Sequence, residues 1–334
     1  MRYPPSPSGP PPPLPRWQGV LALLLIATLF ASNHVAARLA FEQGATVATA
    51  VLIRSIVTML VLLTLLRLAG RPFTVEARMA RRIGLVGLLL TVQSYCLYAA
   101  VSRLPVSLAL LTFNIFPILL AALSWATGSA RPSSRTLIAM PVILAGLALA
   151  LDVLGLGATP IPISAQAGAD GAPPSMIPGV AFALTASLAF ATAMLLTTRW
   201  LNGLDGRLRT GLLMATVAAV VLVAGLVIEA SGLSARSAGG SGPILGPVFG
   251  LPRNTTGWLG LGLLSLLYGV AFGSLFALLP RLGAVNNTPI LNFEPIAAMG
   301  LGVLILDQPV GWLQLAGALL VIGGIAWIAS GKSR

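Results

Sequence analysis

Charged residues are scarce in this chain. They make up 8% of its 334 residues, whereas soluble globular domains have about 25%. Hydrophobic residues account for 57% of the sequence, and the mean hydropathy is +0.94. So few charges cannot cover the surface of a soluble domain of this length. The composition therefore excludes a soluble enzyme or binding module and predicts one polytopic membrane domain.

Cysteine and histidine are nearly absent as well, with Cys96 and His34 as the only examples. One cysteine cannot form a disulfide framework, and no cluster of histidine, cysteine and acidic residues has metal-ligand spacing. No phosphate-binding glycine loop or ATP-binding domain is present. We therefore predict no metal, no cofactor and no catalytic constellation. The net charge of +12 does not indicate a nucleic-acid partner, because the arginines lie mainly in short loops between apolar runs.

Ten apolar runs are long enough to be read as transmembrane helices. Residues 1–16, with eight prolines and a glycine, precede them as a disordered extended tail. All six tryptophans fall near the ends of runs, as expected for an interfacial belt. The predicted spans are 17–39, 47–68, 83–102, 105–127, 134–153, 178–200, 210–230, 255–279, 284–305 and 311–330.

The basic residues predict the orientation of these spans. Fifteen of the twenty lie in the tail, the even-numbered loops or the C-terminus, three lie in the odd-numbered loops, and Arg38 and Arg54 lie within spans. Because cytoplasmic loops are enriched in arginine and lysine, both termini are predicted to be cytoplasmic. The two longest connections, 154–177 and 231–254, are then external and read as flexible connectors.

An internal repeat organises the chain. Arg103-Leu104 is followed after nine residues by Asn114-Ile-Phe-Pro, and Arg281-Leu282 is followed after nine residues by Asn292-Phe-Glu-Pro, a gapless shift of 178. Gly19-Val20 and Phe30-Ala31 match Gly179-Val180 and Phe190-Ala191 at a shift of 160. Each repeat has five spans, and because five is odd the second copy enters the membrane in the opposite direction. Inverted repeats of this kind are typical of secondary transporters, whose sites lie at the repeat interface near the midplane.

Several motifs resemble the EamA branch of the drug/metabolite transporter superfamily. They are Ser32-Asn33-His34-Val35 in the first span, Arg54 in the second, segments 94–111 and 273–324, and Glu294-Pro295 followed by Asp307-Gln308 and Gly311. The resemblance covers residues 17–330. It implies an all-α integral membrane protein with ten transmembrane helices in two inverted five-helix repeats, 17–153 and 178–330. It also implies export of amino acids or similar small metabolites across a bacterial inner membrane.

Glu294 is the most informative candidate site residue. It is the only charge between Leu282 and Leu306, and about twelve residues into its span it lies roughly 18 Å deep. A carboxylate at that depth costs roughly 2.5–3.5 kcal/mol on insertion scales. It can bind a substrate amine or carry a proton, or it can be a protonated structural group hydrogen-bonded to a neighbouring helix.

His34 and Arg54 are the other titratable candidates. Histidine titrates near neutral pH, so His34 is a candidate proton carrier, with a hydrogen-bonded interior histidine as the alternative. Arg54 can pair with a substrate carboxylate, or it can reach outward to headgroups. Both residues are predicted to lie in the outer third of the membrane.

Amides and tyrosines complete the candidate site. Asn33, Asn114 and Asn292 lie in apolar spans, the last two at equivalent repeat positions beside prolines. They are candidates for lining a cavity, with interhelical hydrogen bonding as the alternative. Tyr98, with Tyr95 and Tyr268, can form the wall for an amphipathic solute or pack in the core.

The sequence therefore predicts a secondary transporter, not an enzyme, that exports a small zwitterion by alternating access. Its predicted partners are the lipid bilayer, the solute and protons, and it acts as a monomer or a homodimer. The rival from another class is a membrane-embedded enzyme or lipid-handling protein without solute flux, which would need several polar residues gathered at one interface. A channel is a further rival, but no ring of like charges or filter sequence is present.

Overall fold

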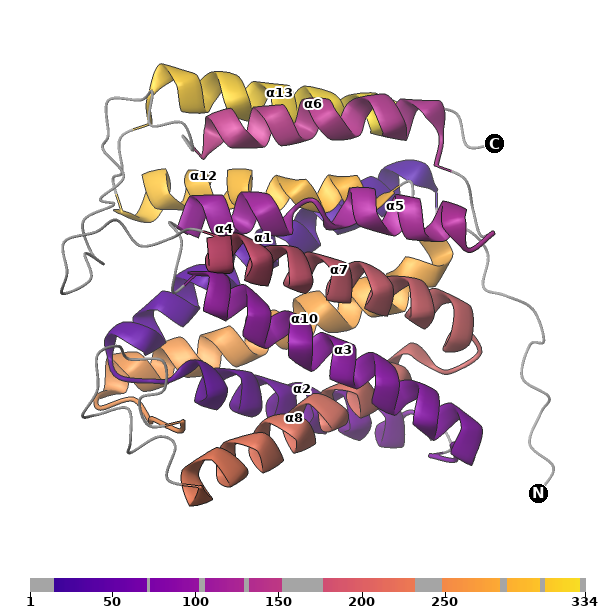
Figure 1. Cartoon of the computed structure of the whole chain (residues 1–334), viewed down its shortest axis with the longest axis vertical. Helices are drawn as coiled ribbons and strands as arrows, with labels where there is room; N and C mark the ends of the chain where they lie inside the picture. The colour runs from indigo at the N-terminus through magenta and orange to yellow at the C-terminus, as the bar shows by residue number, and fades with distance from the viewer. Residues whose placement is uncertain are drawn as a thin grey trace.

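The computed structural model describes residues 15–70, 73–101, 106–128, 132–151, 177–231, 248–282, 287–306 and 310–330. Within these ranges all regular secondary structure is helical (Figure 1). In chain order the elements are α1 (Arg16–Glu42), α2 (Val47–Leu68), α3 (Ala77–Val101), α4 (Val106–Phe113), α5 (Phe116–Ala126), α6 (Ser134–Ala150), α7 (Ile177–Trp200), α8 (Gly206–Ala230), α10 (Thr255–Leu282), the 3-10 helix η2 (Thr288–Phe293), α12 (Glu294–Leu306) and α13 (Trp312–Ser330).

Residues 1–14 of the predicted tail, 1–16, are not among the described residues. Residues 154–176 of the predicted external loop, 154–177, are not among them either. The last part of the connection 231–254 is described, and it is anchored to the turn between α1 and α2. The backbone N–H of Thr46 donates to Gly250 O at 3.1 Å, and the Thr46 hydroxyl donates to Val248 O at 2.8 Å. This part was predicted as flexible, and the prediction missed the anchor because its partners are some 200 residues away in the chain.

Seven segments of the described chain are long and apolar enough to cross a membrane. They are α1, α2, residues 109–126 across α4 and α5, α7, α8, α10 and α13, and α6 is a shorter apolar helix. Their outward faces are apolar too: Val223 and Val227 of α8 are each 60% exposed. A helix that is hydrophobic all round belongs in a membrane or a large core, so the chain is a multi-pass membrane protein.

Two predicted spans are broken at equivalent positions. The span 105–127 is divided into α4 and α5 by a turn at Asn114-Ile115, and the span 284–305 is divided into η2 and α12 at Glu294. Pro117 has no N–H, so it cannot donate to Phe113 O four residues earlier. The hydroxyl of Ser187 in α7 donates to that carbonyl instead, at 3.0 Å. This bond pairs the carbonyl that Pro117 cannot donate to, and it ties α4 to α7.

Helix pairing follows the sequence repeat. α1 packs most extensively on α10, and α7, its repeat counterpart, packs in the same way on α3, the counterpart of α10. Likewise α1 contacts η2 and α12, whereas α7 contacts α4 and α5. The remaining two large pairings, α2 with α8 and α6 with α13, each join a helix to its own counterpart. Exchanging the two halves of the chain therefore leaves the scheme of the large helix pairings unchanged.

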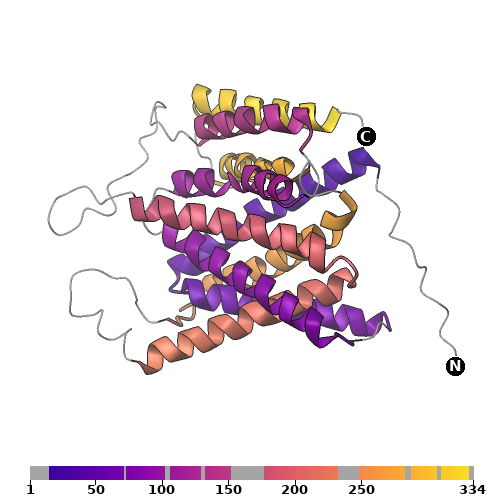
Figure 2. The same cartoon turned by 45° about the vertical axis from the view of Figure 1, so that its right-hand side comes forward.

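The α6 and α13 pair shows how closely this relation holds. A Cβ on Gly146 would lie 3.0 Å from Val321 N, and one on Gly324 would lie 2.6 Å from Ile143 Cγ1. These two contacts interchange under the shift of 178, since 143 corresponds to 321 and 146 to 324. Higher numbers on α6 face lower numbers on α13, so the two counterparts run antiparallel, side by side in both views (Figures 1 and 2).

Candidate functional site

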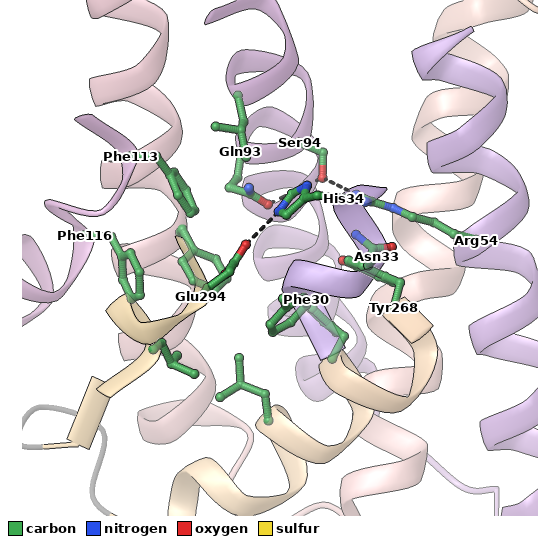
Figure 3. A pocket seen from close by; sticks show the side chains of 15 residues that line it. Phe30, Asn33, His34, Arg54, Gln93, Ser94, Phe113, Phe116, Tyr268 and Glu294 are labelled. Carbon is green, nitrogen blue, oxygen red and sulfur yellow. Dashed lines mark hydrogen bonds and ion pairs between the residues drawn. The ribbon is translucent and has the colours of Figure 1, made fainter. Parts of the chain in front are cut away.

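A small cavity of about 80 Å³ lies among the helices that the repeat relates. This volume has room for a few water molecules. The residues around it are Phe30, Asn33, His34, Arg54, Gln93, Ser94, Leu97, Phe113, Phe116, Phe190, Tyr268, Phe272, Leu275, Leu291 and Glu294 (Figure 3). They come from α1, α2, α3, α4, α5, α7, α10, η2 and α12, so both repeats contribute.

The cavity lies on the axis that relates the repeats. Its lining includes five pairs of repeat-equivalent residues. At a shift of 160 the pair is Phe30 and Phe190; at a shift of 178 the pairs are Ser94 and Phe272, Leu97 and Leu275, Phe113 and Leu291, and Phe116 and Glu294. Residues and their counterparts can line one space only where the axis passes through it. This is the position expected for a transporter site.

His34 and Glu294 contact each other across this cavity. The His34 Nε2 and Glu294 Oε1 atoms are 2.6 Å apart (Figure 3). The two side chains keep 35% and 21% of their surface exposed, respectively, so the space around them is open to solvent. The contact joins α1 to the first residue of α12 and places two of the three predicted titratable groups side by side.

Arg54 reaches the cavity from α2 and is 6% exposed. Its guanidinium carbon lies 3.9 Å from the centroid of the Tyr268 ring, a cation–π geometry. Nη2 donates to the Ser94 hydroxyl at 3.1 Å, which in turn is 3.4 Å from Gln93 Oε1. Arg54 Nε is buried and has no hydrogen-bond partner among the described residues. Arg54 therefore has one donor that no described protein group accepts from, and its side chain forms part of the cavity wall.

The asparagines and Tyr98 differ in their placement. Asn33 lines the cavity and is 2% exposed. Asn114 does not line it, because its amide donates to Leu110 O at 2.8 Å within α4. Asn292 is buried in η2 away from the lining, and its Oδ1 has no described partner. Tyr98 belongs to α3, and its side chain is outside the described part of the chain. The structure thus brings together Asn33, His34, Arg54 and Glu294.

Most of the cavity wall consists of residues that the sequence motifs do not mark as site candidates. Phe30, Phe113, Phe116 and Phe190 surround the polar groups, and the rings of Phe116 and Phe190 meet edge-on with centroids 5.0 Å apart. Tyr268 is predicted from the sequence only as one of three wall tyrosines, and Gln93 and Ser94 are not among the predicted site residues. The repeat was the usable signal, since Phe30 and Phe190 match at a shift of 160.

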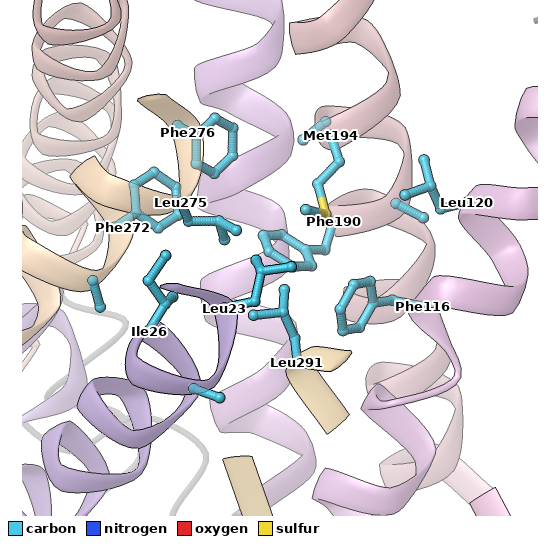
Figure 4. Close-up of a cluster of buried hydrophobic side chains, with 14 of the residues drawn as sticks. Leu23, Ile26, Phe116, Leu120, Phe190, Met194, Phe272, Leu275, Phe276 and Leu291 are labelled. Carbon is cyan, nitrogen blue, oxygen red and sulfur yellow. The ribbon is translucent and has the colours of Figure 1, made fainter. Parts of the chain in front are cut away.

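A group of ten side chains within the large buried apolar cluster lies next to the cavity, and five of its members also line the cavity (Figure 4). We call this the inner cluster: Leu23, Ile26, Phe116, Leu120, Phe190, Met194, Phe272, Leu275, Phe276 and Leu291. Leu23 and Ile26 precede the cavity residues of α1, and Met194 follows Phe190 along α7. The cluster therefore lies toward the end of the molecule where α1 begins and α7 ends, which we call the inner end.

Other chemistry has little support in the described residues. Within them, no group of three or more histidine, cysteine or acidic side chains is placed to hold a metal ion. The polar groups of the cavity instead form an acid–imidazole contact and a separate guanidinium, surrounded by aromatic rings. This arrangement suits reversible binding of a small polar solute.

Comparison with known proteins agrees with this class of molecule. The model of the EamA-like transporter family matches residues 17–151 and again residues 177–330. A solved structure titled "Crystal structure of protein" is similar to this chain with a TM-score of 0.69 at 15% identity, over 94% of this chain and 97% of that one. That similarity concerns the fold alone. No curated protein matches the sequence.

The fold and the cavity define a multi-pass helical membrane protein with an internal cavity lined by polar and aromatic side chains. The chain belongs to the EamA-like transporter family, which confirms the resemblance noted from its motifs. The family consists of membrane transporters for small solutes and is not enzymatic, so the rival interpretation as an enzyme or lipid-handling protein is not favoured.

Proposed function

We propose that this chain is a secondary transporter that exports a small zwitterion, such as an amino acid or a similar metabolite, across a bacterial inner membrane by alternating access. One observation carries the proposal: Arg54 and Glu294, of opposite charge, line the same small aromatic cavity on the repeat axis. A carboxylate on the solute would pair with the guanidinium of Arg54, which lines the cavity. An ammonium group would pair with Glu294, and the phenylalanines would hold the apolar part.

Binding requires the cavity to change. A volume of about 80 Å³ is below the size of typical ligand pockets, and the His34 imidazole already occupies one oxygen of Glu294. The solute ammonium must therefore displace His34 while the cavity widens. His34 and the solute ammonium would compete for the Glu294 carboxylate. The solute and a proton held by the His34–Glu294 pair would therefore bind alternately, which is the basis of exchange transport. Protons are thus the proposed coupling ion.

The proposed topology is ten crossings in two inverted repeats, residues 17–153 and 178–330. It counts α4 with α5 as one crossing and η2 with α12 as another, and it includes α3 and α6. The antiparallel pairing of α6 with its counterpart α13 supports the inversion. The excess of arginine on one side supports cytoplasmic termini, with 1–16 as a cytoplasmic tail and 154–177 as an external loop.

A matched set of ligands tests the function. Purified protein is screened for thermal stabilisation by amino acids, and each hit is compared with its methyl ester, which lacks the carboxylate, and its des-amino acid, which lacks the ammonium. We expect only the zwitterion to stabilise the protein strongly and to show saturable counterflow in proteoliposomes. Stabilisation by all three compounds alike, or product formation without flux, would contradict the proposal.

A further inference from the structure

The helices around the cavity form two bundles. Bundle A contains α1, α10, η2 and α12, and bundle B contains their repeat counterparts α7, α3, α4 and α5. Each bundle therefore combines helices from both halves of the chain. The repeat operation exchanges the two bundles and, if the repeats are inverted, also exchanges the two ends of the molecule.

At the inner end the bundles are joined. In the inner cluster, bundle A supplies Leu23, Phe272 and Phe276, and bundle B supplies Phe116 and Met194, among others. All of these are at most 2% exposed. Buried apolar side chains therefore join the two bundles toward the end where α1 begins (Figure 4).

At the other end, which we call the outer end, the bundles pack separately. One group of buried residues there comes from α1, α10 and the neighbouring α2 and its preceding turn, and includes Ala37, Ala40 and Leu261. A second group comes from bundle B alone and consists of Ala100, Ala109 and Ala183. No described cluster joins the two groups. Among the described clusters, apolar packing therefore joins the bundles at the inner end and not at the outer end, while His34 and Glu294 remain partly exposed.

The repeat identifies the surface that would close the outer end. On bundle A, the counterparts of Met194 and Phe116 are His34 and Glu294. On bundle B, the counterparts of Phe272, Leu275 and Leu291 are Ser94, Leu97 and Phe113. The surface that closes the inner end is therefore large and apolar, whereas its counterpart is polar at three of these five positions.

Within the alternating-access function proposed above, on which this inference rests, we propose that the outer end closes by burying the His34–Glu294 pair beneath Ser94, Leu97 and Phe113. Covering these polar groups opposes closure, whereas closure of the inner end buries only apolar surface. The unequal gates make the outward-open state the resting state. His34 and Glu294 then have a gating role in addition to ligand binding.

A pocket cysteine reports the gates. Gln93→Cys is placed in the full-length protein with Cys96→Ser, and its alkylation by a membrane-impermeant maleimide is timed from each face, in spheroplasts and in inside-out vesicles. Without added ligand we expect fast labelling from outside and slow labelling from inside. The test variant, His34→Met with Glu294→Phe, gives the outer gate the side chains of its inner counterpart. It should lower the outside rate at least about tenfold and raise the inside rate, a shift of about 1.4 kcal/mol between the two states.

Two further variants keep the outcome decisive. His34→Gln with Glu294→Gln removes the titratable groups but keeps the surface polar, so it should keep the outside labelling rate even though the proposed function predicts that it loses concentrative transport. Ser94→Phe leaves the His34–Glu294 pair intact and gives bundle B the side chain that its counterpart Phe272 has on bundle A. It should therefore also lower the rate of labelling from outside. If His34→Met with Glu294→Phe is labelled from outside at the original rate, the gate assignment is wrong. If that variant does not fold, Ser94→Phe decides by the same criterion. Transport by the Gln/Gln variant would instead refute the proposed coupling and leave the gates untouched.

Discussion

Replacing Glu294 by glutamine removes the only acidic side chain among the described cavity residues and keeps its length. Its partner His34 lies 2.6 Å away, but both side chains are partly exposed, and such pairs contribute about 0–1 kcal/mol. Glutamine also retains an oxygen that can accept from His34. The repeat counterpart of Glu294 is Phe116, so the fold does not require a carboxylate here. We therefore expect expression and melting temperature to change little.

Transport should change strongly. A hydrogen bond to a charged group contributes about 1.5–3 kcal/mol, so loss of the carboxylate should weaken apparent affinity for a solute ammonium about tenfold to a hundredfold. Proteoliposomes measure both concentrative uptake and counterflow. If Glu294 carries the proton, concentrative uptake is lost and counterflow survives; if it binds the ammonium, both are lost.

A matched control is available in α8. Glu229→Gln makes the same chemical change at an exposed residue whose carboxylate accepts from Phe249 N at 3.4 Å. Glu229 is not among the residues that line the cavity. This variant should transport normally. If Glu294→Gln also moves solute against a gradient with unchanged affinity, Glu294 is a structural hydrogen-bonding group and the site assignment must shift to other residues.

Three further experiments test separate parts of the account. Arg54→Gln should weaken apparent affinity for a carboxylate-bearing solute at least about tenfold from the outer face, and equal affinity in transport assays would remove Arg54 from the site. Gly146→Leu should lower the melting temperature, because a Cβ there already lies 2.8 Å from α13 and overpacking costs about 1–3 kcal/mol. Gly84→Leu is the control and should not lower the melting temperature, because no atom lies within 4 Å of the added Cβ. In a cysteine-free background, Gly240→Cys should react with an impermeant thiol reagent in spheroplasts and Ser133→Cys should not; the reverse pattern would invert the topology.

Hydropathy alone predicted the helices well, because a membrane span must satisfy its backbone within an apolar helix. The predicted span 47–68 coincides with α2, and 178–200 differs from α7 by one residue. The Asn-x-x-Pro motifs marked the two broken helices, since proline removes a backbone donor. The compensating bond from Ser187 to Phe113 O was not predictable, because 74 residues separate the partners.

The candidate site was harder to predict. Helices that are apolar on both the lipid-facing and the core-facing side give no amphipathic signal, so the sequence does not say which side chains point inward. It therefore selected Asn114 and Asn33 on equal grounds, although only Asn33 lines the cavity. The contact between His34 and Glu294 spans 260 residues and depends on the packing of α1 against α12. The aromatic wall was missed because phenylalanine is common in any membrane helix.

The central claim is that the cavity on the repeat axis binds the transported solute. Substrate protection of Gln93→Cys, in the Cys96→Ser background, tests it most directly. Alkylation from the outer face is timed at increasing concentrations of a solute shown to be transported. We predict that the solute slows labelling and that half-maximal protection falls at the concentration that half-saturates transport. Labelling at full rate under concentrations that saturate transport would place the solute elsewhere and contradict the account.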